Sequence, residues 1–169
     1  MKVNIIRAIL MILLLGTFFT IFGFSNQNGE ESGGLSKRIT QTVTKNIKSV
    51  QQLDKEQREN MLQRIESIIR KIAHFSIYTV VGLLLMGLMS TYPLKENDRI
   101  GISLIIGVIY ASTDEIHQAF IPGRGAQLTD VILDTMGVLL GILLVLTILR
   151  IYKLKKKDRN KESYKKLVL

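Results

Sequence analysis

The chain contains no cysteine, and its 169 residues include only two prolines and two histidines. The absence of cysteine excludes structural disulfides, thiolate zinc sites and thiol nucleophiles. Any chemistry at a site must therefore be built from carboxylates, the two imidazoles and a small number of other polar side chains.

Charged residues are nearly absent from four long stretches, which alternate with strongly polar ones. The length of each stretch is close to what a membrane-spanning helix needs, which is about 17 to 25 mostly apolar residues. The stretches cover residues 8–24, 72–89, 100–121 and 131–149. A backbone in lipid must satisfy its own hydrogen bonds, so we expect all four to be helices. The predicted fold class is all-α: an integral membrane four-helix bundle that makes residues 1–169 a single membrane domain.

The first apolar stretch follows Lys2 and Arg7, as the apolar core of a cleaved signal peptide would. It is longer than the about 7 to 15 residues usual for such a core. The residues around Phe24 and Ser25 make a poor cleavage site, and no cysteine is present for a lipoprotein anchor. We expect a retained helix, and cleavage is the alternative.

Lysine and arginine flank the predicted helices unevenly, which sets the expected orientation. Lys2 and Arg7 precede the first helix, and the tail of residues 150–169 is strongly basic. Four helices place both termini on one side, which we expect to be the cytoplasm. The connections 25–71 and 122–130 are then extracytoplasmic. The expected location is the cell membrane, with several passes.

The formal net charge of +9 comes mostly from the tail, so the tail decides how this charge is interpreted. A basic cytoplasmic tail is explained by helix orientation and by anionic lipid headgroups. The predicted partner is therefore the lipid bilayer, and nucleic-acid binding loses its support.

The connection between the first and second predicted helices has the spacing of an amphipathic helix. Apolar residues recur every three or four positions from Leu35 to Val50 and again from Leu53 to Ile69. Such a segment can lie on the outer leaflet or cover the end of the bundle. Residues 28–34 are rich in Gly, Glu and Ser and predict a flexible link.

Polar residues gather at those helix ends that the predicted topology places on the outer side. They are Ser25, Gln27, Arg70, Lys71, His74, Asp114, Glu115, His117, Gln118, Asp130 and Asp134. Helices joined by short turns are neighbours, so these clusters are expected to converge on one pocket. An ionisable residue at mid-helix costs roughly 2.5 to 3.5 kcal/mol on insertion scales, and it usually has a partner or a function.

Helical spacing supports this convergence. Asp114, His117 and Gln118 share one face of the third helix. Asp130 and Asp134 continue on the fourth helix into Gly137 and Gly141, a pattern of small residues that lets helices approach closely. Lys71, His74 and Tyr78 line up on the second helix, where Tyr78 is predicted to be an interior packing residue with a hydrogen bond. Pro122 and Gly123 predict a tight turn, followed by Arg124, which can hold a phosphate or carboxylate with two hydrogen bonds.

Five motifs together resemble the VanZ-like family of bacterial membrane proteins. They are Phe24-Ser-Asn-Gln27, Arg70-Lys-Ile-Ala-His-Phe-Ser-Ile-Tyr78, Asp114-Glu-Ile-His-Gln118, Pro122-Gly-Arg124 and Asp130-Val-Ile-Leu-Asp134-Thr-Met-Gly137. The resemblance covers all four helices and is weakest in the insert 29–67. It implies a small bacterial membrane protein of the cell envelope, some of whose relatives are linked to teicoplanin (glycopeptide) antibiotic resistance. It implies no mechanism.

The first functional hypothesis is an outward-facing site that binds or modifies an anionic envelope lipid or a lipid-linked cell-wall precursor. The hypothesised binding residues are Arg70, Lys71, Gln118, Arg124, Asp130, Asp134, Ser25 and Gln27. If chemistry occurs, Asp114 or Glu115 with His117 would be the acid–base pair and His74 a second proton carrier. Whether the protein is an enzyme stays open, and no cofactor is indicated.

Alternatives from other classes use the same residues. A metal-dependent variant would use His74, Asp114, His117 and Asp134, and it ranks below simple ion pairing. A non-catalytic protein could instead shield the outer leaflet through the segment 35–69, and a small transporter is the last alternative. In a purely structural interpretation, Asp134 pairs with Lys71 or Arg70, His74 with Asp114, and Arg124 with Asp130. Such contacts average only about 0.6 kcal/mol in membranes, which favours a function for the cluster.

Overall fold

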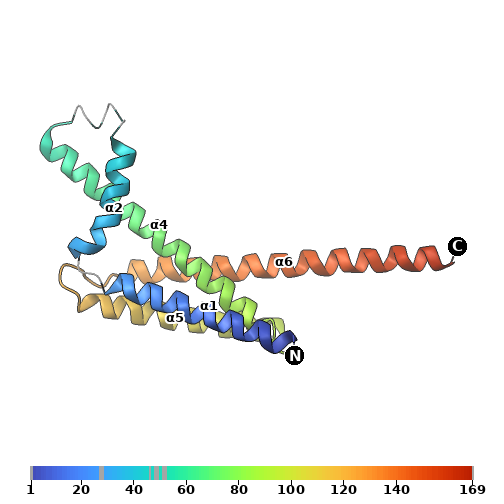
Figure 1. Cartoon of the computed structure of the whole chain (residues 1–169). Coiled ribbons are helices and arrows are strands. Elements are labelled where there is room, and N and C mark those ends of the chain that lie inside the picture. The colour runs from blue at the N-terminus through green and yellow to red at the C-terminus, as the bar shows by residue number, and fades with distance from the viewer. Residues whose placement is uncertain (1, 27–28, 46, 48–49, 51–52, 169) are drawn as a thin grey trace.

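The computed structural model describes residues 2–26, 29–45, 47, 50 and 53–168, and all regular elements in these ranges are helices. They are α1 (Lys2–Ser25), α2 (Gly29–Thr44), α4 (Lys55–Met89), α5 (Glu96–Ala119) and α6 (Leu128–Val168). Within the described residues, α1, α4, α5 and α6 are long and apolar enough to cross a membrane. The predicted all-α bundle with four spans is confirmed, and Figure 1 shows the four helices running alongside one another.

The helices α4 and α6 form the central pair of the bundle. They have the most extensive contact in the molecule, and α5 packs against both of them while α1 packs against α4 and α5. The shared core contains Tyr78, Val81, Leu85, Val138 and Ile142, which are all essentially inaccessible. Many large apolar side chains on the outside of the bundle are exposed, as lipid-facing residues of a membrane protein are expected to be.

Close approach of α4 and α6 depends on glycine. A Cβ atom added to Gly137 would lie 2.6 Å from the carbonyl oxygen of Phe75, and one added to Gly141 would overlap the carbonyl oxygen of Thr79. Gly82 on α4 faces the backbone of Val138 in the same way. The small-residue pattern on the fourth helix therefore marks a helix contact, as predicted, because only glycine lets the two backbones come this close.

Two helices extend beyond the predicted spans. The second span was expected to begin at Ile72, but α4 begins at Lys55, where Asp54 caps it by accepting a hydrogen bond of 2.8 Å from the backbone N–H of Gln57. The fourth predicted span is part of α6, which continues through the basic tail to Val168. An apolar run indicates only the part of a helix that lies in lipid. The helix itself extends beyond that run until a capping residue such as Asp54 ends it.

Most of the described residues in the connection between the first and second spans are helical, as predicted. The helix α2 packs against α4, and Figure 1 shows it beside the N-terminal part of α4, beyond the end of the bundle. Thr40, Thr44 and Val50 are buried there. The predicted flexible link at 28–34 differs from the structure, because α2 already begins at Gly29.

The opposite end of the bundle joins the N-terminus to the turn between α4 and α5. Arg7 donates hydrogen bonds to the side chain and carbonyl oxygens of Thr91 (3.1 and 2.6 Å), and its guanidinium lies 4.1 Å from the centre of the Tyr92 ring. At the same end, Arg150 of α6 forms an exposed ion pair of 3.2 Å with Glu96. Both termini lie toward this end (Figure 1), as expected for four passes.

Candidate functional site

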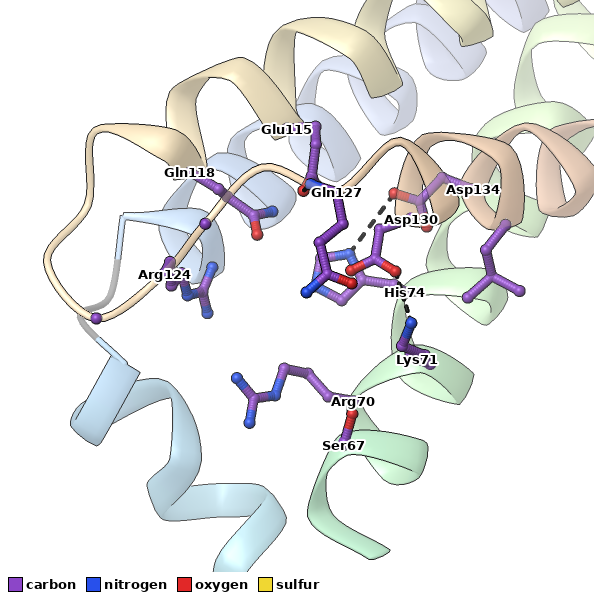
Figure 2. Close-up of a pocket in the computed structure, with 13 residues that line it drawn as sticks. Ser67, Arg70, Lys71, His74, Glu115, Gln118, Arg124, Gln127, Asp130 and Asp134 are labelled. Atoms are coloured by element: carbon purple, nitrogen blue, oxygen red, sulfur yellow. Dashed lines mark hydrogen bonds and ion pairs between the residues drawn. The ribbon is translucent and has the colours of Figure 1, made fainter. Parts of the chain in front are cut away.

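A pocket of about 290 Å³ opens at the end of the bundle where α5 ends and α6 begins. Residues from α4, α5, α6 and the turn between α5 and α6 line it: Ser67, Arg70, Lys71, His74, Glu115, Gln118, Gly123, Arg124, Gly125, Gln127, Asp130, Leu133 and Asp134. Figure 2 shows these side chains converging from separate helices. The polar helix ends therefore converge on one pocket, as predicted.

The pocket lies at the expected depth of a membrane boundary. At 1.5 Å per residue, Arg70 is about 28 Å along α4 from Met89, which is close to the about 30 Å thickness of a hydrocarbon core. His74 is about one turn deeper. For a span that ends at Met89, the mouth of the pocket is therefore expected at headgroup level and its floor within the apolar layer.

Two arginines face the open part of the pocket, Arg70 from α4 and Arg124 from the turn (Figure 2). Gly123 makes this turn possible, since its φ of 77° is in the left-handed region that favours glycine. Arg124 donates a hydrogen bond of 3.3 Å to the carbonyl oxygen of Ser25. Burial, and then the positive charge of Arg70, lower the pKa of Arg124. The Nε atom of Arg70 is buried and has no hydrogen-bond partner among the described residues.

The rim of the pocket is held by an ion pair and by a loop contact. Lys71 of α4 pairs with Asp130 of α6 at 2.7 Å, with both side chains partly exposed. Glu115 of α5 accepts a hydrogen bond of 2.6 Å from the backbone N–H of Gln127, which fixes the loop to the end of the helix. The purely structural interpretation paired Asp134 with Lys71 or Arg70, and Arg124 with Asp130. The structure instead pairs Lys71 with Asp130, which lies one helical turn before Asp134 on α6.

The floor of the pocket brings His74, Asp114 and Asp134 together from three helices. One candidate ligand atom of each lies within 4.8 Å of those of the other two. The Nδ1 atom of His74 is 3.9 Å from Oδ2 of Asp134, which is too long for a hydrogen bond. Both aspartates are buried. Two ionised carboxylates whose oxygens lie within 4.8 Å of each other would repel by at least about 3.5 kcal/mol at an effective dielectric constant of about 20, so a positive charge or a proton near them would stabilise this floor.

The first helix reaches the site through Ser25. Gln118 donates hydrogen bonds to Oδ2 of Asp114 (3.0 Å) and to the hydroxyl oxygen of Ser25 (3.2 Å). His117 takes no part in this network, because its ring stacks on Phe22 with centroids 4.9 Å apart. Its buried Nε2 atom has no hydrogen-bond partner among the described residues.

The structure thus brings together most of the residues that the sequence singled out. Ser25, Arg70, Lys71, His74, Asp114, Glu115, Gln118, Arg124, Asp130 and Asp134 line the pocket or contact residues that do. His117 is not among the lining residues, and Gln27 lies outside the described residues. Sequence reasoning missed Ser67 and Gln127. Ser67 had a usable signal, since it is one helical turn from Lys71 on the same face.

The family model described as VanZ/LLP1 matches residues 9–150, a range that includes the whole pocket. No curated protein and no solved structure matches the chain.

Proposed function

From the premise that the chain belongs to the VanZ/LLP1 family, we propose that its pocket binds the anionic headgroup of an envelope lipid or lipid-linked cell-wall precursor. The phosphate of that headgroup would lie between Arg70 and Arg124 on the outer face of the membrane. The observation that carries the proposal is that these two guanidinium groups, from different elements, face one pocket at the end of the bundle.

The mutual repulsion of Arg70 and Arg124 favours an anion between their guanidinium groups. The positive charge of Arg70 acts on Arg124, and each guanidinium is partly withdrawn from water. An anion between them would offset this repulsion, and guanidinium groups bind phosphate with two parallel hydrogen bonds. Lys71 is less available for this role because Asp130 already pairs with it.

Size limits what can enter. A volume of about 290 Å³ is at the lower end for small-molecule sites. It suits a phosphate and the adjoining part of a headgroup, whereas the rest of a large precursor would remain outside. Acyl or prenyl chains would stay in the bilayer, alongside the apolar exterior of the helices.

Binding a precursor or lipid at the outer surface offers a route to altered teicoplanin (glycopeptide) susceptibility, which the family resemblance suggests. The bound headgroup would be less accessible to the antibiotic, or its amount at the surface would change. No chemical step is required for this role. An acid–base function of His74, Asp114, Glu115 and His117 stays a prediction.

The proposal can be tested with the purified full-length protein in nanodiscs of phosphatidylcholine. The probes are undecaprenyl phosphate and phosphatidylglycerol, added separately, and binding is measured by native mass spectrometry. Arg70→Ala and Arg124→Ala should each weaken binding about tenfold or more, since a hydrogen bond to a charged group contributes about 1.5–3 kcal/mol. Arg150→Ala is the matched control, because Arg150 lies at the opposite end of the bundle. The lipid that binds more tightly identifies the source of the headgroup.

Equal binding by wild type and both pocket variants would refute the proposal. The same variants are then compared for teicoplanin susceptibility in cells that contain equal amounts of the protein in the membrane. The pocket variants should lose the effect of the wild type, and Arg150→Ala should retain it.

A further inference from the structure

We propose that His74, Asp114 and Asp134 form a binding site for one divalent transition-metal cation, of the class of Zn²⁺ or Mn²⁺, at the floor of the pocket. This inference goes beyond headgroup binding and does not depend on it. It also reverses the ranking that sequence spacing gave, in which metal binding came below simple ion pairing.

The geometry is close to that of a preformed site. The three residues come from α4, α5 and α6, and their candidate ligand atoms all lie within 4.8 Å of one another. Ligands bound tetrahedrally to one zinc ion at about 2.0–2.2 Å lie about 3.3–3.6 Å from one another. Metal binding would therefore draw the most widely separated ligand atoms together by up to about 1.4 Å, through a change of side-chain rotamer.

A second observation points to a missing cation. The side chain of Asp134 is 3% exposed, and its Oδ1 atom is buried without a hydrogen-bond partner among the described residues. Its other oxygen faces His74 at 3.9 Å, beyond hydrogen-bond distance. Buried carboxylates are normally paired, hydrogen-bonded or bound to metal. Asp134 has one oxygen that none of these satisfies.

The basic side chains of the pocket leave this oxygen unsatisfied. Lys71 is engaged by Asp130. Arg124 interacts electrostatically with Asp114, and Gln118 donates a hydrogen bond to one oxygen of Asp114. Asp114 is therefore partly compensated and held in position, whereas Asp134, with its unpartnered Oδ1 atom, depends on the cation more completely.

The donor set indicates the class of metal. One imidazole nitrogen and two carboxylate oxygens suit zinc and manganese, and three protein ligands leave at least one coordination position open. The fully buried Tyr78 lies near Asp114 and Asp134, and its hydroxyl group interacts with the side chain of Asp114. His117, the fourth candidate from the sequence, is stacked on Phe22 instead.

The experiment uses the full-length protein in nanodiscs without anionic lipid. The protein is stripped with a chelator and dialysed against Zn²⁺ or Mn²⁺ alone. Bound zinc is measured by elemental analysis and bound manganese by electron paramagnetic resonance. We expect about one ion per chain of at least one of the two metals. Asp134→Asn and His74→Gln should each reduce affinity at least tenfold, whereas Asp98→Asn should stay within about twofold because Asp98 is exposed at the other end of α5.

Thermal unfolding separates loss of the site from loss of the fold. Without metal, Asp134→Asn should unfold at the same temperature as wild type or higher, because it removes one of two facing carboxylates. Added metal should raise the unfolding temperature of wild type only. Because no anionic lipid is present, failure of headgroup binding leaves this result unaffected.

Two outcomes would overturn the proposal. The first is fewer than about 0.1 ions per chain in folded wild type with either metal, which would assign the balancing charge to a proton shared by the aspartates. The second is equal metal affinity in wild type and in a folded Asp134→Asn variant.

Discussion

The substitution Gly137→Ala tests how strictly the contact between α4 and α6 positions the site. The added Cβ would be 2.6 Å from the carbonyl oxygen of Phe75, whereas ordinary contact begins at 3.4 Å. The obstacle is backbone, so one helix must move by about 0.8 Å relative to the other, and overpacking of this kind costs about 1–3 kcal/mol. Gly137 is one helical turn from Asp134, so the same movement would separate Asp134 from His74.

Gly16→Ala is the matched control. Gly16 is also inside a membrane-spanning helix, but a Cβ there has nothing within 4 Å. Both substitutions gain the higher helix propensity of alanine, up to about 1 kcal/mol, so this gain cancels in the comparison. Gly137→Ala should thus be about 1–3 kcal/mol less stable than Gly16→Ala.

The assay is reversible unfolding in mixed micelles with increasing sodium dodecyl sulfate, followed by circular dichroism. If Gly137→Ala and Gly16→Ala differ by less than about 0.5 kcal/mol, the close approach of the two helices does not limit packing. Gly137 would then not be needed to hold Asp134 near His74.

Three further predictions concern the rim, the opposite end and the orientation. A double-mutant cycle of Lys71→Gln and Asp130→Asn should give a coupling free energy of only about 0.2–1 kcal/mol in the same unfolding assay, because the two side chains are 43% and 32% exposed. A coupling free energy above about 2 kcal/mol would place the pair deeper in the bilayer. Arg7→Ala should lose about 1–3 kcal/mol of stability, because two hydrogen bonds to Thr91 and the contact with Tyr92 disappear, and Arg7→Lys should recover only part of it. Because the chain has no cysteine, Gly125→Cys should react with a membrane-impermeant maleimide added to intact cells and Asn97→Cys should not; the reverse pattern would invert the proposed orientation.

The four spans were predictable from the sequence because membrane insertion depends on a run of apolar residues, which composition reveals directly. Their ends were less predictable. The stretch before Ile72 has amphipathic rather than apolar character, so it was assigned to the connection, although Asp54 caps it as part of α4. The spacing of Gly137 and Gly141 identified the helix contact, since small residues four positions apart in a membrane helix are typical of closely packed helix pairs.

The residues of the site were largely predictable, but their pairings were not. Helical periodicity indicates which side chains share a face, and short turns indicate which helices are neighbours. Neither fixes the axial position of one helix relative to its neighbour. That axial position decides that Lys71 contacts Asp130 and that His74 lies near Asp134. The position of His117 against Phe22 depends on how α1 packs on α5. The residue periodicity within one helix gives no information about that packing.

The length of α6 gives the pocket a mechanical connection to the other side of the membrane. Its 41 residues form one helix of about 60 Å, and neither proline of the chain lies within it. Asp130 and Asp134 are in its first two turns, whereas its basic end projects past the bundle (Figure 1). Over that length, a tilt of about 5° moves the far end by about 5 Å. A change of occupancy at the pocket that tilted α6 would thus displace the far tip of this helix, with no proline between the two to bend it.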